Sequence, residues 1–207
     1  MQIKKAVLLL SGGIDSPIAG HLMKKAGCWH ISYGIESGDP NILKGMKKNL
    51  NIEQIKKAVH WSKEAGVYTK GFFMVGFPDE SEASLSATLS LVMSLPLDDI
   101  SVMQLTPFPG SQLYETAEKY GEFERDWRKM NTLDTVFVPH GFSRRDLEAA
   151  RAEILRKFYL RPSIIYRQIR RVALNPRVAL SLLKGFLAFL MVTGLFSRNA
   201  DKKRTER

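Results

Sequence analysis

Four short apolar runs, each followed by a helix-like segment, constrain what this chain of 207 residues can fold into. Residues 67–75 form a continuous run bounded by Gly76 and Pro78, which is typical of a strand buried on both faces of a parallel sheet. The runs are residues 3–10, 31–34, 67–75 and 99–105. This alternation predicts an α/β fold. We expect about four βα units that form a partial (β/α) barrel or a short, mainly parallel sheet, followed by a basic all-helical tail.

The positive charge of the chain is concentrated in that tail. From Arg151 onward there are fourteen Lys or Arg and three Asp or Glu, whereas residues 1–150 contain 17 and 18, respectively. This distribution argues against a nucleic-acid-binding face on the α/β part. The tail is expected to be helical over residues 144–159, 163–174 and 177–196.

The last of these helices has an apolar run over residues 185–196, which is shorter than the ~20 residues that span a bilayer. Basic residues lie on both sides of it. The pattern favours a helix that lies on a membrane surface. The alternative is a helix that packs its apolar face on the α/β part or on a protein partner.

Cys28 is the only cysteine, so the chain can form no internal disulfide and no complete cysteine-based metal site. A reducing, cytoplasmic location is expected, with the tail adding a peripheral position at the inner face of the membrane. The apolar run of residues 6–10 is too short for a signal peptide. The histidines show no metal-ligand spacing, and we predict no catalytic or metal-binding side chain. These histidines are His21, His30, His60 and His140.

A glycine-rich loop follows the first apolar run and precedes the first predicted helix. A strand, a loop of small residues and a helix N-terminus together make a cradle for an anion. The residues expected to contact a phosphate group are Ser11, Gly12, Gly13, Asp15 and Ser16. The alternative is an ordinary turn between a strand and a helix.

The run VLLLSGGIDSPIAGHLMKK resembles the pyrophosphate loop of the ATP pyrophosphatases and is most similar to the tRNA 4-thiouridine sulfurtransferases. The resemblance covers about residues 1–27 and implies ATP binding for adenylation, with tRNA as partner. The downstream catalytic cysteine of that family has no counterpart here.

The second apolar run ends in a turn that contains Glu36, Ser37 and Gly38. Ligands of α/β sheets and barrels bind at this end of the strands. A carboxylate can accept hydrogen bonds from a ribose diol, and glycine allows the backbone to approach closely. The alternative is a tight turn with a solvated glutamate.

Three longer segments resemble the latter half of a radical S-adenosylmethionine (SAM) barrel. They read GCWHISYGIESGDPNILKGMKKN, AGVYTKGFFMVGFPDESE and ISVMQLTPFPGSQLYETAEKYG. Their spacing is most similar to the cobalamin-dependent cyclases and methylases. The resemblance is densest over residues 22–121 and extends through the tail to residue 207. We therefore expect a pyrophosphate-loop-like βα unit over 1–27, a partial barrel over 28–142 and a basic helical extension over 143–207.

This resemblance implies a set of SAM-binding residues at the ends of three strands. Glu36 and Ser37 would meet the ribose, and Lys48 the methionine carboxylate. Gly76, Phe77 and Pro78 would lie near the adenine, and Thr106, Pro107 and Gly110 near the adenine or the substrate. Alternatively, the glycines and prolines only shape turns, and Lys48 is a solvated charge.

The chain departs from that family at the iron–sulfur cluster. The family holds its [4Fe-4S] cluster with three cysteines in a C-x₃-C-x₂-C loop, and one cysteine cannot replace them. Strands one to three of the barrel also have no counterpart, and a half barrel exposes strand edges. We therefore expect a truncated or chimeric protein that binds SAM and lacks the cluster ligands. Its exposed strand edges would be covered by the N-terminal βα unit, by the tail, or by association with itself or with a missing barrel half. The alternatives are an ATP-binding adenylating protein and a non-enzymatic module that binds a membrane or partner.

Overall fold

The computed structural model describes residues 7–10, 17–48 and 50–174, together with residues 185, 187 and 190. The chain divides into two compact units, unit 1 over Met1–Arg151 and unit 2 over Ala152–Arg207. Each unit is described by itself.

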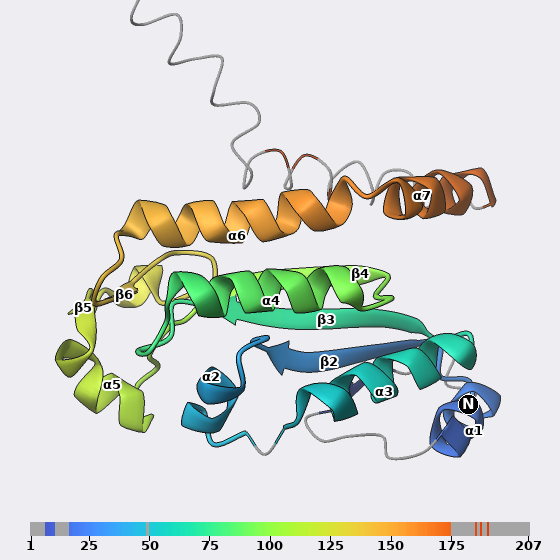
Figure 1. Ribbon diagram of the computed structural model, residues 1–207, viewed down its shortest axis with the longest axis horizontal. Coiled ribbons are helices and arrows are strands. Elements are labelled where there is room, and N and C mark those ends of the chain that lie inside the picture. The colour runs from blue at the N-terminus through green and yellow to red at the C-terminus, as the bar shows by residue number, and fades with distance from the viewer. Residues whose placement is uncertain are drawn as a thin grey trace, which may run out of the picture. The chain divides into compact units, whose positions relative to one another are not determined.

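Unit 1 is built on a four-stranded sheet whose strands are all parallel and lie in chain order (Figure 1). The strands are β1 (Val7–Leu10), β2 (His30–Glu36), β3 (Tyr68–Val75) and β4 (Asp99–Gln104). The strand order does not reverse, in contrast to the order in a doubly wound sheet. The predicted α/β fold with parallel strands is confirmed, and the described strands do not close into a barrel.

Four helices connect these strands or follow them. They are α1 (Pro17–Lys25), α2 (Pro40–Gly45), α3 (Ile52–Glu64) and α4 (Glu82–Ser94). Side chains cap the later three, because Asp39, Asn51 and Ser81 accept hydrogen bonds from backbone N–H groups of the first turns. Right-handed crossovers between consecutive parallel strands place the connecting helices on one face of the sheet.

The core of unit 1 lies between this face and the helices. Alternate residues of the strands are buried there, which is the period of two expected for a strand. Burial of each large apolar side chain stabilises the fold by about 1.5–3 kcal/mol. Tyr33 reaches α3, where its hydroxyl lies 2.5 Å from Ser62 Oγ. The other buried strand residues include Ile31, Ile35, Phe73, Val75, Ile100 and Val102.

Beyond β4 the chain forms several small elements. They are α5 (Gln112–Thr116), two 3₁₀ turns (Ala117–Lys119 and Trp127–Lys129) and an antiparallel hairpin of β5 (Gly121–Phe123) and β6 (Phe137–Pro139). The hairpin requires glycine at position 121, because a Cβ there would lie 2.0 Å from the carbonyl oxygen of Val138 on the opposite strand.

Helix α6 (Arg144–Tyr159) begins in unit 1 and ends in unit 2, and α7 (Pro162–Leu174) belongs to unit 2. Both match the predicted helices. Ser143 opens α6, and its hydroxyl and backbone N–H both bond Asp146. The predicted helix over 177–196 lies outside the described residues except at 185, 187 and 190. Among the helices that the structure describes, none has the length and apolar character needed to cross a membrane.

Candidate functional site

The candidate site is the rim formed where β2, β3 and β4 end. The arrowheads of these strands point the same way in Figure 1, so the turns that follow them gather at one edge of unit 1. Three of the predicted SAM-binding groups of residues stand at this edge, one after each strand. This is the end of a parallel sheet at which ligands bind.

Glu36 is the most unusual residue of the rim. Its φ angle is +67°, a left-handed conformation that is rare for a residue with a long side chain. The register of β2 against β3 shifts between Gly34 and Glu36, as in a β-bulge. Backbone strain of this kind costs about 1–3 kcal/mol and gathers at functional sites.

Only one of the two oxygens of the Glu36 carboxylate contacts Lys48 in an ion pair. Its Oε1 atom accepts a hydrogen bond from Lys48 Nζ at 2.5 Å, and Lys48 also donates to the carbonyl oxygen of Gly34 at 3.3 Å. The side chains of Lys48 and Glu36 are 27% and 13% exposed. The second oxygen, Oε2, is buried and has no hydrogen-bond partner in the described part of the chain. A buried carboxylate oxygen without a donor is costly unless a ligand supplies one.

Gly34 makes room for this ion pair. A Cβ at this position would lie 2.9 Å from Glu36 Oε1 and 3.1 Å from Lys48 Nζ. Any other residue would displace the carboxylate or the ammonium group. The sequence analysis missed this role, because a glycine inside a strand carries no signal that names its neighbour.

Ser37 faces α4 rather than the rim. Its side chain is buried, its Oγ lies 3.2 Å from Thr88 Oγ1, and it accepts a hydrogen bond from Asp39 N–H. The N–H of Gly38 donates to the same threonine hydroxyl at 2.9 Å. Ser37 therefore fastens the turn to α4, whereas the carboxylate of Glu36 bonds Lys48.

The turn after β3 is organised by Glu80, which the sequence analysis did not single out. Oε2 of this buried residue accepts hydrogen bonds from the N–H groups of Gly76 (3.0 Å) and Phe77 (3.4 Å), and Oε1 accepts one from Ser84. Gly76 has φ +92°. Burial raises the pKa of Glu80 against the opposing effect of these hydrogen bonds. Phe77 is buried and Pro78 is partly exposed.

Of the three predicted site residues after β4, two are buried and one is exposed. Thr106 is buried and its hydroxyl donates to the carbonyl oxygen of Asn131 at 2.9 Å. Pro107 is buried as well, whereas Gly110 is exposed with φ +84°. Thus the hydroxyl of Thr106 is engaged in a contact within unit 1. At the end of β4, Gln104 is buried, and neither polar atom of its side chain has a partner among the described residues.

The predicted phosphate-binding residues lie outside the described part of the chain. These are Ser11, Gly12, Gly13, Asp15 and Ser16. Their flanking elements, β1 and α1, have the predicted type and order.

The described residues do not fit an iron–sulfur cluster. Cys28 is 7% exposed and its thiol lies 3.5 Å from the carbonyl oxygen of His30, at the start of β2 and so at the opposite end of the sheet from the rim. Within the described residues no three His, Cys, Asp or Glu side chains come close enough together to hold a metal ion. The chain has no second thiolate, so no step is assigned to a cluster here.

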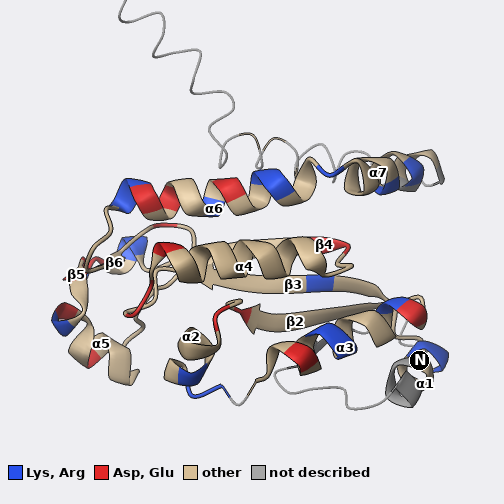
Figure 2. Cartoon of the chain, viewed as in Figure 1, with Lys and Arg blue, Asp and Glu red and all other residues tan. Residues whose placement is uncertain are grey.

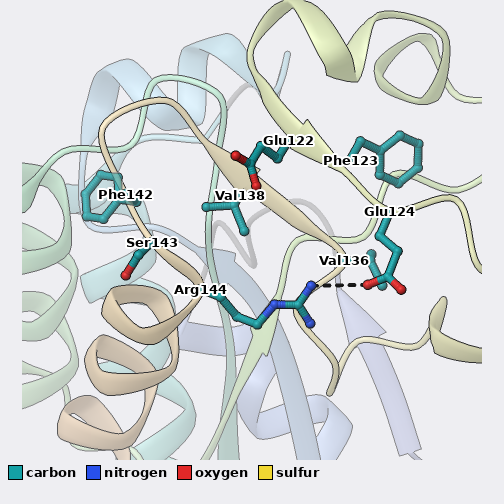
Figure 3. Close-up of a pocket in the computed structure, with 8 residues that line it drawn as sticks. All are labelled: Glu122, Phe123, Glu124, Val136, Val138, Phe142, Ser143 and Arg144. Atoms are coloured by element: carbon teal, nitrogen blue, oxygen red, sulfur yellow. Dashed lines mark hydrogen bonds and ion pairs between the residues drawn. The ribbon is translucent and has the colours of Figure 1, made fainter.

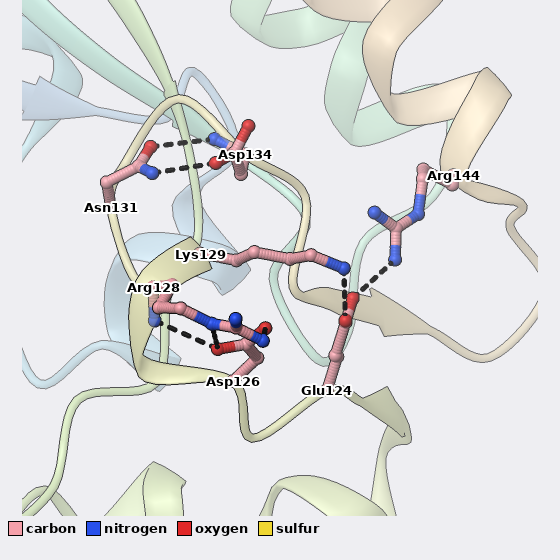
Figure 4. A network of polar contacts seen from close by, with 7 residues as sticks. All are labelled: Glu124, Asp126, Arg128, Lys129, Asn131, Asp134 and Arg144. Carbon is pink, nitrogen blue, oxygen red and sulfur yellow. Dashed lines mark hydrogen bonds and ion pairs between the residues drawn. The ribbon is translucent and has the colours of Figure 1, made fainter.

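A separate indentation of about 400 Å³ lies between the β5–β6 hairpin and the start of α6 (Figure 3). None of the predicted site residues lines it. Its charged border belongs to a surface network in which Lys129 and Arg144 both bond Glu124 (Figure 4). These two cations lower the pKa of Glu124. Exposed ion pairs of this kind contribute little to stability.

Comparison with known proteins identifies a family for part of the chain. Residues 4–92 match the radical SAM superfamily. An uncharacterized methyltransferase of Pyrococcus horikoshii is 32% identical over 148 residues, which are 71% of this chain and 32% of that protein. The anaerobic magnesium-protoporphyrin IX monomethyl ester cyclase of Cereibacter sphaeroides is 26% identical over 164 residues, or 79% of this chain and 27% of that one.

The fold has a counterpart among solved structures. Elp3 of the archaeon Methanocaldococcus infernus matches 76% of this chain and 33% of its own length, with a TM-score of 0.52 and 18% sequence identity. The chain spans about a third or less of the length of the curated relatives described above. The family match begins at residue 4 and so includes the segment that resembles the ATP pyrophosphatases. Residues 4–92 of this chain therefore belong to the radical SAM superfamily, and its relatives include methyltransferases and cyclases.

Proposed function

We propose that unit 1 binds SAM at the rim of β2, β3 and β4, as the cofactor-binding part of a radical SAM protein of the methyltransferase and cyclase type. The observation that carries the proposal is the strained Glu36, whose buried Oε2 has no donor among the described residues. A ribose diol supplies the hydrogen-bond donors that this oxygen lacks. The neighbouring Lys48 offers a cation to the carboxylate of the methionine part.

The turns after β3 and β4 would hold the adenine. Glu80 fixes the backbone of Gly76 and Phe77, so the N–H and C=O groups of this turn are already ordered before a ligand arrives. An ordered turn lowers the entropy cost of binding. Phe77, Pro78 and Pro107 add apolar surface at the same edge of the sheet.

Reductive cleavage of SAM by this chain alone is not expected. Cleavage in this superfamily depends on a [4Fe-4S] cluster, and Cys28 is the only thiolate that the chain contains. We propose a chain that retains the SAM-binding strands and does not itself supply the cysteine ligands of the cluster. Anaerobic reconstitution with iron and sulfide, followed by a visible absorption spectrum, tests this. A stoichiometric cluster on the monomer would overturn it.

SAM binding is tested by isothermal titration calorimetry of the full chain with SAM. We expect Glu36→Gln to weaken binding by about 10–100-fold, because a hydrogen bond to a charged group contributes about 1.5–3 kcal/mol. Glu53→Gln is the matched control, since Glu53 is an exposed glutamate that also pairs with a lysine. Equal affinity of the parent and Glu36→Gln would remove the proposal.

ATP serves as the second ligand in the same titration, because it discriminates the adenylating alternative. That alternative rests on the SGGIDS loop and predicts that Asp15→Ala and Ser16→Ala lose ATP affinity. It also predicts that Glu36→Gln binds ATP as well as the parent does. Tight ATP binding with no SAM binding would favour the adenylating protein over the radical SAM protein.

A further inference from the structure

Helix α7 presents an apolar stripe that is exposed. Ile165, Tyr166 and Ile169 are 43%, 66% and 63% exposed. Successive helical residues are about 100° apart, which places these three side chains, with Pro162 and Ala173, on one arc of about 120°. The only isoleucine outside this arc, Ile164, is buried. Exposed apolar side chains gathered on one face mark an interaction surface.

The positive charge of this region indicates which kind of partner the apolar stripe binds. Helix α7 reads PSIIYRQIRRVAL and contains three arginines and no acidic residue. Figure 2 shows basic and no acidic ribbon along this helix. Between residues 154 and 200 the sequence has nine Lys or Arg and no Asp or Glu. A surface that is both apolar and strongly cationic matches the headgroup region of an anionic bilayer, where each cation contributes about 1 kcal/mol.

We propose that α7 is an interfacial helix that binds an anionic lipid surface through Ile165, Tyr166 and Ile169. Its 13 residues span about 20 Å, too short for the ~30 Å hydrocarbon core, so the helix would lie in the plane of the interface. Tyr166 would place its ring among the headgroups, where amphipathic aromatic residues are favoured. Arg170 is exposed next to the stripe and would meet lipid phosphates. This inference does not depend on the proposed SAM site.

The test is flotation of the full chain with vesicles. One set is pure phosphatidylcholine and the other contains about 25% phosphatidylglycerol, an anionic lipid. We expect at least fivefold stronger binding to the anionic set, since one lipid-facing cation alone contributes about that factor. Equal binding to both sets would overturn the proposal, as would retention of the chain by single-stranded RNA without any vesicle binding.

Two variants with the same charge change locate the contact on α7. Ile169→Glu lies within the stripe, and Ser163→Glu is an exposed position of the same helix outside it. We expect Ile169→Glu to weaken binding at least tenfold more than Ser163→Glu, because only the former removes an inserted side chain. Arg170→Gln should lower binding to the anionic set about fivefold and leave the neutral set unchanged. Equal effects of Ile169→Glu and Ser163→Glu would place the contact elsewhere in the tail and overturn the assignment to α7.

Discussion

The ammonium group of Lys48 and the carboxylate of Glu36 meet at 2.5 Å, while the second oxygen of the same carboxylate stays without a donor in the described part of the chain. The pair therefore offers a ligand two complementary groups on adjacent side chains, an acceptor and a cation. A nucleoside diol could donate to Oε2 of Glu36 and a ligand carboxylate could approach Lys48 while the contact between Lys48 and Glu36 remains. Three of the four predictions that follow concern this rim or the turns beside it.

The first prediction distinguishes binding of the methionine part of SAM from binding of its adenosine part. Lys48→Met keeps an unbranched stem and removes the cation. We expect the affinity for SAM to fall about fivefold to tenfold, since charge-assisted hydrogen bonds contribute more than neutral ones. The affinity for adenosine, which has no carboxylate, should stay the same. Titration calorimetry with both ligands checks this, and an equal loss for both would contradict the assigned role of Lys48.

The second prediction contrasts Gly34 in β2 with Gly38 in the turn that follows this strand. A Cβ on Gly38 would lie 2.4 Å from the carbonyl oxygen of Ala87, whereas a Cβ on Gly34 would meet the movable ends of Glu36 and Lys48. Gly38→Ala should therefore lower the free energy of unfolding by about 1–3 kcal/mol. Gly34→Ala should change it by less than about 1 kcal/mol and should weaken SAM binding instead. Urea unfolding and SAM titration of both variants measure the contrast, which a larger destabilisation by Gly34→Ala would refute.

The third prediction concerns pH. Burial raises the folded-state pKa of Glu80, so the folded state binds more protons than the unfolded state between the ordinary pKa of 4.5 and the raised value. The contribution of Glu80 to stability is therefore lost as pH rises through that interval. Glu80→Gln resembles the neutral acid and does not titrate. Its stability relative to the parent should rise with pH from about 4.5 upward.

Urea unfolding of the parent and of Glu80→Gln across this pH range measures the effect of that residue. Glu64→Gln, an exposed glutamate at the end of α3, is the control. A difference between parent and Glu80→Gln that is constant with pH would show that Glu80 does not titrate in this way.

The fourth prediction concerns the outer edge of the sheet. Arg151 donates from Nε to the carbonyl oxygen of Val102 on β4 and from a terminal nitrogen to that of Leu133, each at 2.9 Å. Arg151→Met keeps the apolar stem but leaves the Val102 carbonyl without this donor. We expect a loss of about 1–2 kcal/mol in the free energy of unfolding. Self-association should also increase, because unpaired edge strands recruit other strands.

Light scattering after size-exclusion chromatography and urea unfolding measure both effects of Arg151→Met. The exposed Arg145 on the same helix provides a control for the loss of positive charge. If Arg145→Met associates as strongly as Arg151→Met, net charge rather than the strand edge is responsible.

Much of the fold of unit 1 could be predicted because its elements are long and clearly bounded. Helix α4 runs over Glu82–Ser94, and the sequence bounds it with a serine that caps it and a proline that follows it. The strands follow from uninterrupted apolar runs. The β5–β6 hairpin was not predicted, since strands of three residues are too short to show a period. Their pairing depends on residues that are distant in the sequence.

The sequence indicated which turns form the candidate site, but it did not indicate the backbone conformation or the burial of the residues in them. The sequence places Glu36 at the end of a strand and Lys48 after the short helical segment that follows, but no local signal indicates the left-handed backbone of Glu36. Glu80 reads as a solvated charge in a turn, and it is buried only because the folded turn closes over it. Ser84, four residues later on the same face of the helix start, was the one available hint that this carboxylate has a partner.

At the bulge that ends β2, two neighbouring residues contact different parts of unit 1. Glu36 turns to the rim, while Ser37 and Gly38 are fastened to Thr88 of α4. A single peptide unit thus links an outer helix to the carboxylate of the rim. A shift of α4 would act through these hydrogen bonds on the backbone next to Glu36, so an event on the outer surface of this helix would affect the proposed SAM site.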